Sequence, residues 1–429
     1  MSDTSFEETL FETLTDDSDS PGGLDEDAQA VEPGNFLRHA MSLTASKVAD
    51  GLIDPKLVLS WLLSSLGASA LFVGLLVPIR EAGALLPQLF VADRIRAMPR
   101  RKWFWAAGSL GQGLATAGIV LAGLTLDGNA AGAVICLLVA LLAVSRSICS
   151  ASFKDVLGKT VGKTRRGSVT GLASSFASVG VVVFALLLLS GVAERMVLVI
   201  GALTLAAGLW LAAGAVFSTL REMRSPGAAG SGGNPLRQLK LLSEDRQLVV
   251  LIVARGLLVS TALAPPYLVL LGQEDGGQAF GRLGALVLAS AVASLISSYV
   301  WGRLADRSSR NVLRLAGVAG AVAMGGAVVL DLLGQIGTVW ALPAVLFVLM
   351  VAYHGVRQGR STYLVDMAPP EARASYTAVS NTVIGVLLLA SGAFGALASL
   401  MGPNATLCVF AGMSLAAAVV ATRLAEVEA

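Results

Sequence analysis

The sequence predicts an all-α membrane protein with twelve transmembrane helices, arranged as two pseudo-symmetric six-helix bundles around a central cavity. Three observations support this class. The mean hydropathy is +0.73 and only 14% of the 429 residues are charged, and both values lie outside the range of soluble globular proteins. Apolar runs of about 20 residues, each long enough to cross a bilayer, recur along the chain. Landmarks of the first half reappear at a nearly constant distance in the second.

The chain opens with an acidic tail, residues 1–43. Eleven of its first 35 residues are Asp or Glu and none is Lys or Arg, so we expect a disordered cytoplasmic segment. A basic stretch followed by an apolar core is missing from it, so it does not resemble a secretory signal peptide. We therefore expect the first membrane helix to direct insertion.

Ten membrane helices are clear from apolar runs alone. They are expected near 103–126, 130–151, 168–191, 195–218, 247–271, 280–302, 312–333, 339–361, 374–399 and 404–423. Before residue 100 the apolar pattern is ambiguous. The internal repeat resolves it into helices at about 44–66 and 70–95, joined by a tight turn near Gly67.

The repeat divides the membrane region into two homologous six-helix bundles, residues 44–220 and 247–423. A Gly- and Ser-rich linker, residues 221–246, joins them, and residues 424–429 form the C-terminus. Three landmarks define the offset of 210 or 211 residues: the segments from Gly74 and Gly284, Pro55 and Pro265, and the pairs Arg146 with Asp155 and Arg357 with Asp366.

Lys and Arg concentrate in alternate connections, as the positive-inside rule requires. The connections near 94–102, 154–166, 221–246, 303–314 and 357–373 are basic, whereas those on the other side carry little beyond Arg195. This distribution predicts an integral protein of the cell (inner) membrane with both termini in the cytoplasm.

The stretch GRLADRSSRN, residues 302–311, resembles the signature cytoplasmic loop of the major facilitator superfamily of secondary transporters. In the corresponding loop of the first half, Arg96 takes the place of Asp306, while Arg100 keeps the place of Arg310. The resemblance implies that the loop aspartate helps to close a cytoplasmic gate by facing the positive end of a helix dipole. The gating candidates are Arg96, Arg100, Arg146, Asp155, Gly302, Asp306, Arg307, Arg310, Arg357 and Asp366.

Four charges lie near the middle of the first two predicted helices, in the stretches Asp54-Pro55-Lys56 and Arg80-Glu81. Each would cost about 3 kcal/mol if it faced lipid, so these side chains must face protein or water and pair with one another. Arg80 and Glu81 are adjacent and cannot face the same point, so one of them could instead be a purely structural partner that fixes the first helix against the second. The substrate and coupling candidates are Asp54, Lys56, Arg80, Glu81, Arg255 and Tyr267.

Enzymatic classes find no support in the sequence. The two histidines are far apart, HExxH is missing, and so is the phosphate-binding loop GxxxxGK[ST] of ATP-driven pumps. We expect no enzyme activity, no cofactor, no metal and no nucleic-acid partner. The expected partners are the lipid bilayer, a small-molecule substrate and protons or another coupling ion, and we expect a monomer.

The predicted function is secondary active transport by alternating access. Asp54 and Glu81 are the candidate proton carriers, because the pKa of a carboxylate in a low-dielectric site depends on how closely a cation approaches it. Glu81 is preferred, because Asp54 lies beside Pro55 and Lys56 and is expected to stay paired within its own helix turn. The alternative is a membrane assembly factor or receptor that keeps the scaffold without transporting, since fold does not fix function.

Overall fold

The computed structural model describes residues 11, 24, 26–87, 98–224, 239–274, 283–369 and 372–427, and within them every regular element is helical. The helices are α2 (Glu26–Gln29), α3 (Glu32–Ile53), α4 (Val58–Ser65), α5 (Ala70–Leu85), α7 (Lys102–Thr125), α8 (Gly128–Thr160), α9 (Arg166–Ser190), α10 (Arg195–Ser218), α11 (Leu241–Glu244), α12 (Arg246–Leu263), α13 (Pro265–Glu274), α14 (Leu283–Leu332), α15 (Ala341–Met367), α16 (Arg373–Ala390) and α17 (Ala393–Ala421).

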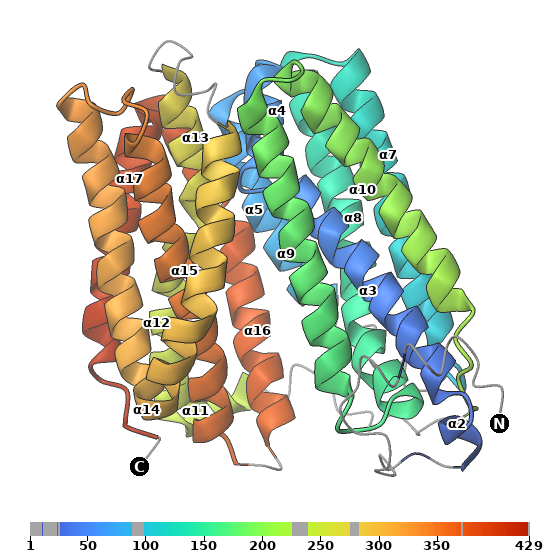
Figure 1. The fold of residues 1–429 in the computed structure, drawn as a ribbon. Helices are drawn as coiled ribbons and strands as arrows, with labels where there is room; N and C mark the ends of the chain where they lie inside the picture. Colours follow the sequence, from blue (N-terminus) through green and yellow to red (C-terminus); the bar gives the residue numbers. More distant parts are fainter. Residues whose placement is uncertain are drawn as a thin grey trace.

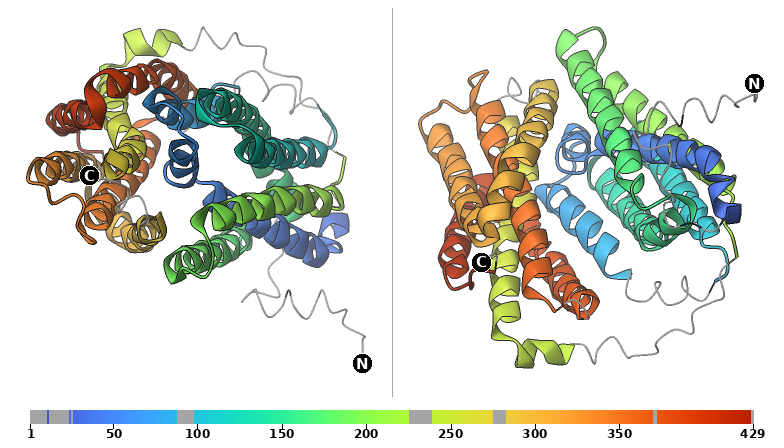
Figure 2. Two further views of the ribbon diagram at one scale, coloured as in Figure 1. Left: turned by 90° about the horizontal axis from the view of Figure 1, so that it is seen from above. Right: turned by 60° about the horizontal axis from the view of Figure 1, so that its bottom comes forward.

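The helices form two groups that stand side by side (Figures 1 and 2). Helices α3 to α10 make up the first half and α11 to α17 the second, with α5 at the boundary between them. We call the end at which α3 begins and α17 ends the basic end, because it carries Arg101, Arg165 and Arg310. The turns at Gly67, Gly191 and Gly334 lie at the opposite end, and each of these glycines has a positive φ.

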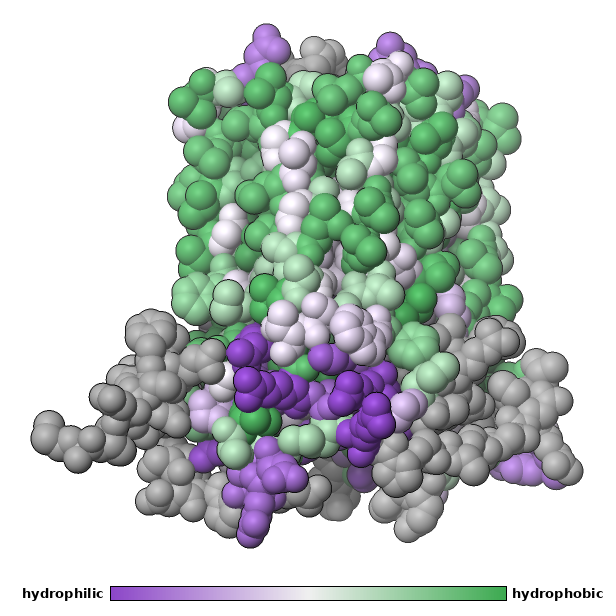
Figure 3. Space-filling model, turned by 90° about the vertical axis from the view of Figure 1, so that its right-hand side faces the viewer, coloured by the Kyte–Doolittle hydropathy of each residue, from purple (hydrophilic) through white to green (hydrophobic). Residues whose placement is uncertain are grey.

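The outer wall of the molecule is apolar over most of its height, and a polar band follows it at the basic end (Figure 3). Leu137 and Leu332 are 71% and 78% exposed on that wall, as expected of side chains that face lipid. In the described part of the chain, nine helical spans are long and apolar enough to cross a membrane. Further crossings complete the series: α3 together with α4, then α5, and α16 together with the start of α17. This arrangement agrees with the predicted fold class.

The first crossing differs from its prediction. It was expected to begin near residue 44, but α3 begins at Glu32, so residues 32–43 are helical and not part of a disordered tail. Glu32 is buried and accepts hydrogen bonds from Gly162 N (2.8 Å) and Arg165 (2.9 Å), which attach this polar extension to the first half. A search for apolar runs misses such an extension because protein, not lipid, covers it.

The first crossing is broken around Pro55, one of the landmarks of the internal repeat. α3 ends at Ile53 and α4 begins at Val58. Proline has no N–H to donate, and the Asp54 carboxylate accepts a hydrogen bond from Lys56 N (2.8 Å), which turns the chain locally. The corresponding crossing of the second half is also divided, into α12 and α13, immediately before Pro265.

Two long helices contain turns that the predicted boundaries anticipated. α14 has an extended residue at Ser308, which separates the spans Leu283–Ala305 and Arg307–Leu332. α17 is interrupted at Gly402, whose φ of 80° lies in the left-handed region. The run predicted at 130–151 was too short, since α8 continues in polar sequence to Thr160.

The two halves pack closely at the opposite end. On α5, Gly74 faces Gly395 of α17 so closely that a methyl group on either would overlap the other helix. Gly284 at the start of α14 meets the α9 backbone at Ala185 in the same way. Backbones can approach this far only where side chains are absent, so the two halves are tightly closed here.

Candidate functional site

A cavity of about 440 Å³ lies between the two halves and combines side chains of α3, α8 and α9 with side chains of α14 and α15. A second cavity, of about 430 Å³, shares Ser294, His354 and Arg357 with it. A third, of about 40 Å³, contains Glu81, Arg255 and Arg360 and again Arg357. Because Arg357 contributes to all three, we treat them together and call them the central cavity.

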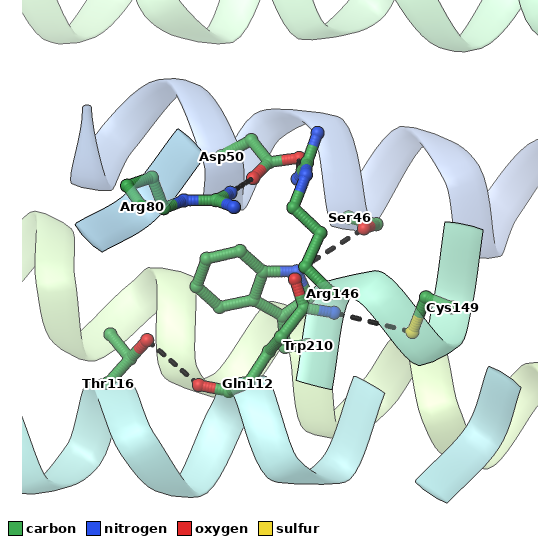
Figure 4. Close-up of polar contacts among 8 residues, drawn as sticks. All are labelled: Ser46, Asp50, Arg80, Gln112, Thr116, Arg146, Cys149 and Trp210. Carbon is green, nitrogen blue, oxygen red and sulfur yellow. Dashed lines mark hydrogen bonds and ion pairs between the residues drawn. The ribbon is translucent and has the colours of Figure 1, made fainter. Parts of the chain in front are cut away.

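Asp50 of α3 is the centre of the charge network in the first half (Figure 4). One carboxylate oxygen accepts a hydrogen bond from Arg80 of α5 (2.9 Å), and the other accepts one from Arg146 of α8. One acid therefore joins three helices and satisfies two cations. Arg80 is buried, whereas the Arg146 side chain is 39% exposed and lines the cavity.

A layer of polar contacts lies behind this network (Figure 4). Trp210 of α10 donates from Nε1 to Ser46 Oγ (3.2 Å), four residues before Asp50 on α3. Gln112 of α7 donates to Cys149 Sγ (3.4 Å), which lies close to Arg146 on α8. These contacts fix α3 and α8 against their neighbours and so limit how the carboxylate and the guanidinium can move.

The break between α3 and α4 brings a cation to the other half. Lys56 is buried, and its Nζ lies 3.4 Å from the ring centroid of Tyr353 on α15, a cation–π contact. Asp54 lines the cavity, but its carboxylate bonds the Lys56 backbone. The Asp54 carboxylate thus bonds within its own turn of the chain, and Arg80 pairs with Asp50 and not with another of the four midplane charges.

Glu81 and Arg255 meet in the smallest part of the cavity. Arg255 of α12 is buried and donates to Ser380 Oγ (2.7 Å) and Asn381 Oδ1 (2.9 Å) of α16. Within the described residues, the Glu81 carboxylate makes no ion pair and no hydrogen bond. Glu81 is thus a carboxylate with cations around it and none bound to it.

The remaining substrate candidate, Tyr267, has a different environment. It is only 1% exposed, it packs edge-to-face on Phe410 (5.4 Å between centroids), and its hydroxyl lies beside Gly74. It contributes to none of the cavities described above. Tyr267 belongs to the core between the halves.

The first-half gating candidates Arg146 and Asp155, nine residues apart on α8, bind different partners. Arg146 pairs with Asp50 and not with Asp155. Asp155 instead pairs with Arg101 and, at 2.7 Å, with Lys159. The repeat spacing identified equivalent positions, but a helix separates residues nine apart by about 13 Å along its axis, so they do not meet.

The second-half gating candidates Arg357 and Asp366 also lie in different environments. Arg357 lines the central cavity, whereas Asp366 is exposed near the end of α15. Arg310 pairs with Glu426 (2.5 Å) and donates to Leu424 O (3.2 Å), which attaches the turn in α14 to the segment after α17.

Three other gating candidates lie in the described part of the chain. Arg100 and Arg307 are exposed and Gly302 is partly buried. Arg96 and the side chain of Asp306 lie outside the described residues.

Three charged cavity residues were absent from the predicted set: Asp50, Lys47 and Arg360. Asp50 and Lys47 precede Asp54 by one and two helical turns, and Arg360 follows Arg357 by three residues, so each shares a helix face with a residue that was named. Helical spacing could have found them. Among the described residues, no group of three His, Cys, Asp or Glu side chains could hold a metal ion.

The Major Facilitator Superfamily model matches residues 42–387 and 266–429, which together cover most of the chain. The chain belongs to the Major Facilitator Superfamily. It is therefore a secondary transporter by family, and nothing supports the non-transporting alternative. No curated protein matches the sequence.

Solved structures with the same fold are those of transporters. A nucleoside transporter, NupG, is 13% identical, with a TM-score of 0.66, over 91% of this chain and 98% of that one. A D-xylose-proton symporter is 12% identical, with a TM-score of 0.67, over 92% and 98%. A POT family transporter in complex with a thioalcohol-conjugated peptide is 10% identical, with a TM-score of 0.65, over 90% and 94%. At such identities the likeness concerns the fold.

Proposed function

We propose that this superfamily member moves a small solute across the cell membrane by alternating access of the central cavity, with its basic end in the cytoplasm. One observation carries the proposal: a single cavity is lined by ionisable side chains of both halves, while close backbone packing joins the halves at the opposite end. A solute in that cavity touches both halves, so its binding depends on their relative position.

We further propose that protons drive the transport through Glu81. This carboxylate faces the cavity beside Arg255 and Arg360 without an ion pair among the described residues. Arg255 and Arg360 belong to the second half and Glu81 to the first, so a movement between the halves changes their separation. A carboxylate whose cations withdraw binds a proton more readily, and it releases that proton when they return.

A flux assay in proteoliposomes tests the coupling, with a solute chosen because it stabilises the protein against heat. Glu81→Gln cannot exchange a proton, so we expect accumulation driven by a pH gradient to fall to background. Exchange of labelled for unlabelled solute without a gradient should persist. Glu194→Gln, at an exposed glutamate of the opposite end, is the control and should accumulate normally.

The outcomes separate the two parts of the proposal. A Glu81→Gln protein that still accumulates solute in response to a pH gradient excludes Glu81 as the carrier. A wild-type protein that binds solute but exchanges none would exclude transport itself.

A further inference from the structure

The central cavity contains more positive than negative charge. Its lining includes three carboxylates, Asp50, Asp54 and Glu81. It also includes six basic side chains: Lys47, Lys56, Arg146, Arg255, Arg357 and Arg360. Topological signals do not explain such an excess, because positive charges that only set orientation belong in the connections between helices.

The internal repeat shows where the excess arises. In the first half, Arg146 shares the Asp50 carboxylate with Arg80. Offsets of 210 for the first two helices and 211 for the fourth map Asp50 and Arg80 onto Ser260 and Ser290, and Arg146 onto Arg357. The second half thus keeps the cavity arginine but has serine in place of the acid that neutralises it.

The structure agrees with this reading. Arg357 is exposed to all three parts of the cavity, and within the described residues it makes no hydrogen bond and no ion pair. Arg360 lies three residues further along the same face of α15 and also has no such partner there. Lys47 faces the cavity from α3, and its Nζ donates hydrogen bonds to neutral oxygens, Thr170 O (3.1 Å) and Ser174 Oγ (2.5 Å); it forms no ion pair in the part of the chain that the structure describes.

We propose that the transported solute is a small organic anion whose carboxylate or phosphate group binds Arg357, with Arg360 and Lys47 on either side. A guanidinium presents two parallel N–H donors to such a group, and the bond is stronger where water is partly excluded. Leu57, Val287 and Met350 give the same cavity an apolar surface for the carbon skeleton. The inference rests on the proposed transport function and names its substrate class.

Binding to the full-length protein in detergent tests the class directly. The probes are anions, each paired with a neutral compound of the same carbon skeleton: benzoate with benzamide, succinate with succinamide, and glucose 6-phosphate with glucose. We expect thermal stabilisation by at least one anion and by none of the neutral partners. Arg357→Gln should weaken that anion's binding about tenfold or more, since a charge-assisted hydrogen bond is lost. Arg357→Lys should retain part of it, and Arg423→Gln, at an exposed arginine after α17, should retain all of it.

Every result decides the question. Stabilisation by no anion, equal stabilisation by anion and neutral partner, or anion binding that Arg357→Gln leaves unchanged each overturns the proposal. Transport can be judged separately in proteoliposomes. Uptake of a neutral or cationic solute would keep the proposed function and reject the anion, whereas anion binding at Arg357 without flux would keep the site and reject transport.

Discussion

Asp50 binds two arginines of the first half, Arg80 and Arg146, through one carboxylate. Each of its oxygens accepts from a different guanidinium, so α3, α5 and α8 meet at a single side chain. A cation inside a membrane protein is tolerated when a counter-charge is within reach. Arg80 and Arg146 depend on the same acid for that purpose.

Asp50→Asn should destabilise the protein, because two cations lose their shared counter-charge. We expect a loss of about 2 kcal/mol, below the 3 to 5 kcal/mol of a fully buried pair, since the Arg146 side chain is 39% exposed to the cavity. Thermal unfolding in detergent measures it as a lower midpoint. Glu244→Gln removes one member of an exposed ion pair with Lys240 and should change the midpoint very little. Equal shifts for the two variants would show that the Asp50 network does not stabilise the fold.

The sequence predicted some of the residues that belong to the site, but not the partners that they bind. The sequence indicated that Lys56 and Glu81 face protein, because charges in apolar helices cannot face lipid, and the structure places both against the cavity. It could not assign partners. The choice between Asp50 and Asp54 as the acid that binds Arg80 depends on the turn after Ile53, which moves Asp54 off the helix.

At the scale of elements, small residues decide where helices cross. Gly74 on α5 and Gly395 on α17 bring the two halves into backbone contact, and Gly385 on α16 receives Leu86 of the first half. The repeat predicted the division into two halves. The crossing points depend on which face of each helix carries the small residue, and hydropathy does not report that.

Gly74→Ala should weaken the contact between α5 and α17, because the added methyl group overlaps the Gly395 backbone. We expect a destabilisation of about 2 kcal/mol, typical of overpacking at a close contact. Gly412→Ala on α17 is the matched control, since nothing lies near the added methyl group there. The comparison uses thermal unfolding of both variants, and a Gly74→Ala protein as stable as its control would contradict the described crossing.

At the scale of the whole molecule, polarity divides the protein along its height. The apolar wall covers the span of the helices, and charged side chains gather at the basic end (Figure 3). Buried polar anchors reinforce that end: Glu222 accepts hydrogen bonds from the backbone N–H groups of Arg101 (3.0 Å) and Lys102 (2.8 Å) at the start of α7. The placement of Lys, Arg and apolar runs along the sequence predicted this division, because the division depends on the surrounding solvent and lipid and not on side-chain packing.

The proposed orientation can be measured by labelling with a membrane-impermeant maleimide in a Cys408→Ser background, since Cys408 is the exposed cysteine of the chain. Val192→Cys, at the exposed turn after Gly191, should react in intact cells. Lys163→Cys, exposed between α8 and α9, should react only after the membrane is opened. The reverse pattern would invert the orientation, and reaction of both in intact cells would contradict the fold.

The contact of Gly74 on α5 with Gly395 on α17 is also a point about which the two helices could rotate relative to each other. Leu85 lies eleven residues beyond Gly74, about 16 Å along α5 at a rise of 1.5 Å per residue. A tilt of about 15° at the crossing therefore carries Leu85, at the wall of the cavity, through about 4 Å, while the glycines hardly move. If the two halves pivot at this glycine contact, the charged residues further along α5 move with Leu85, and the cavity widens towards the basic end.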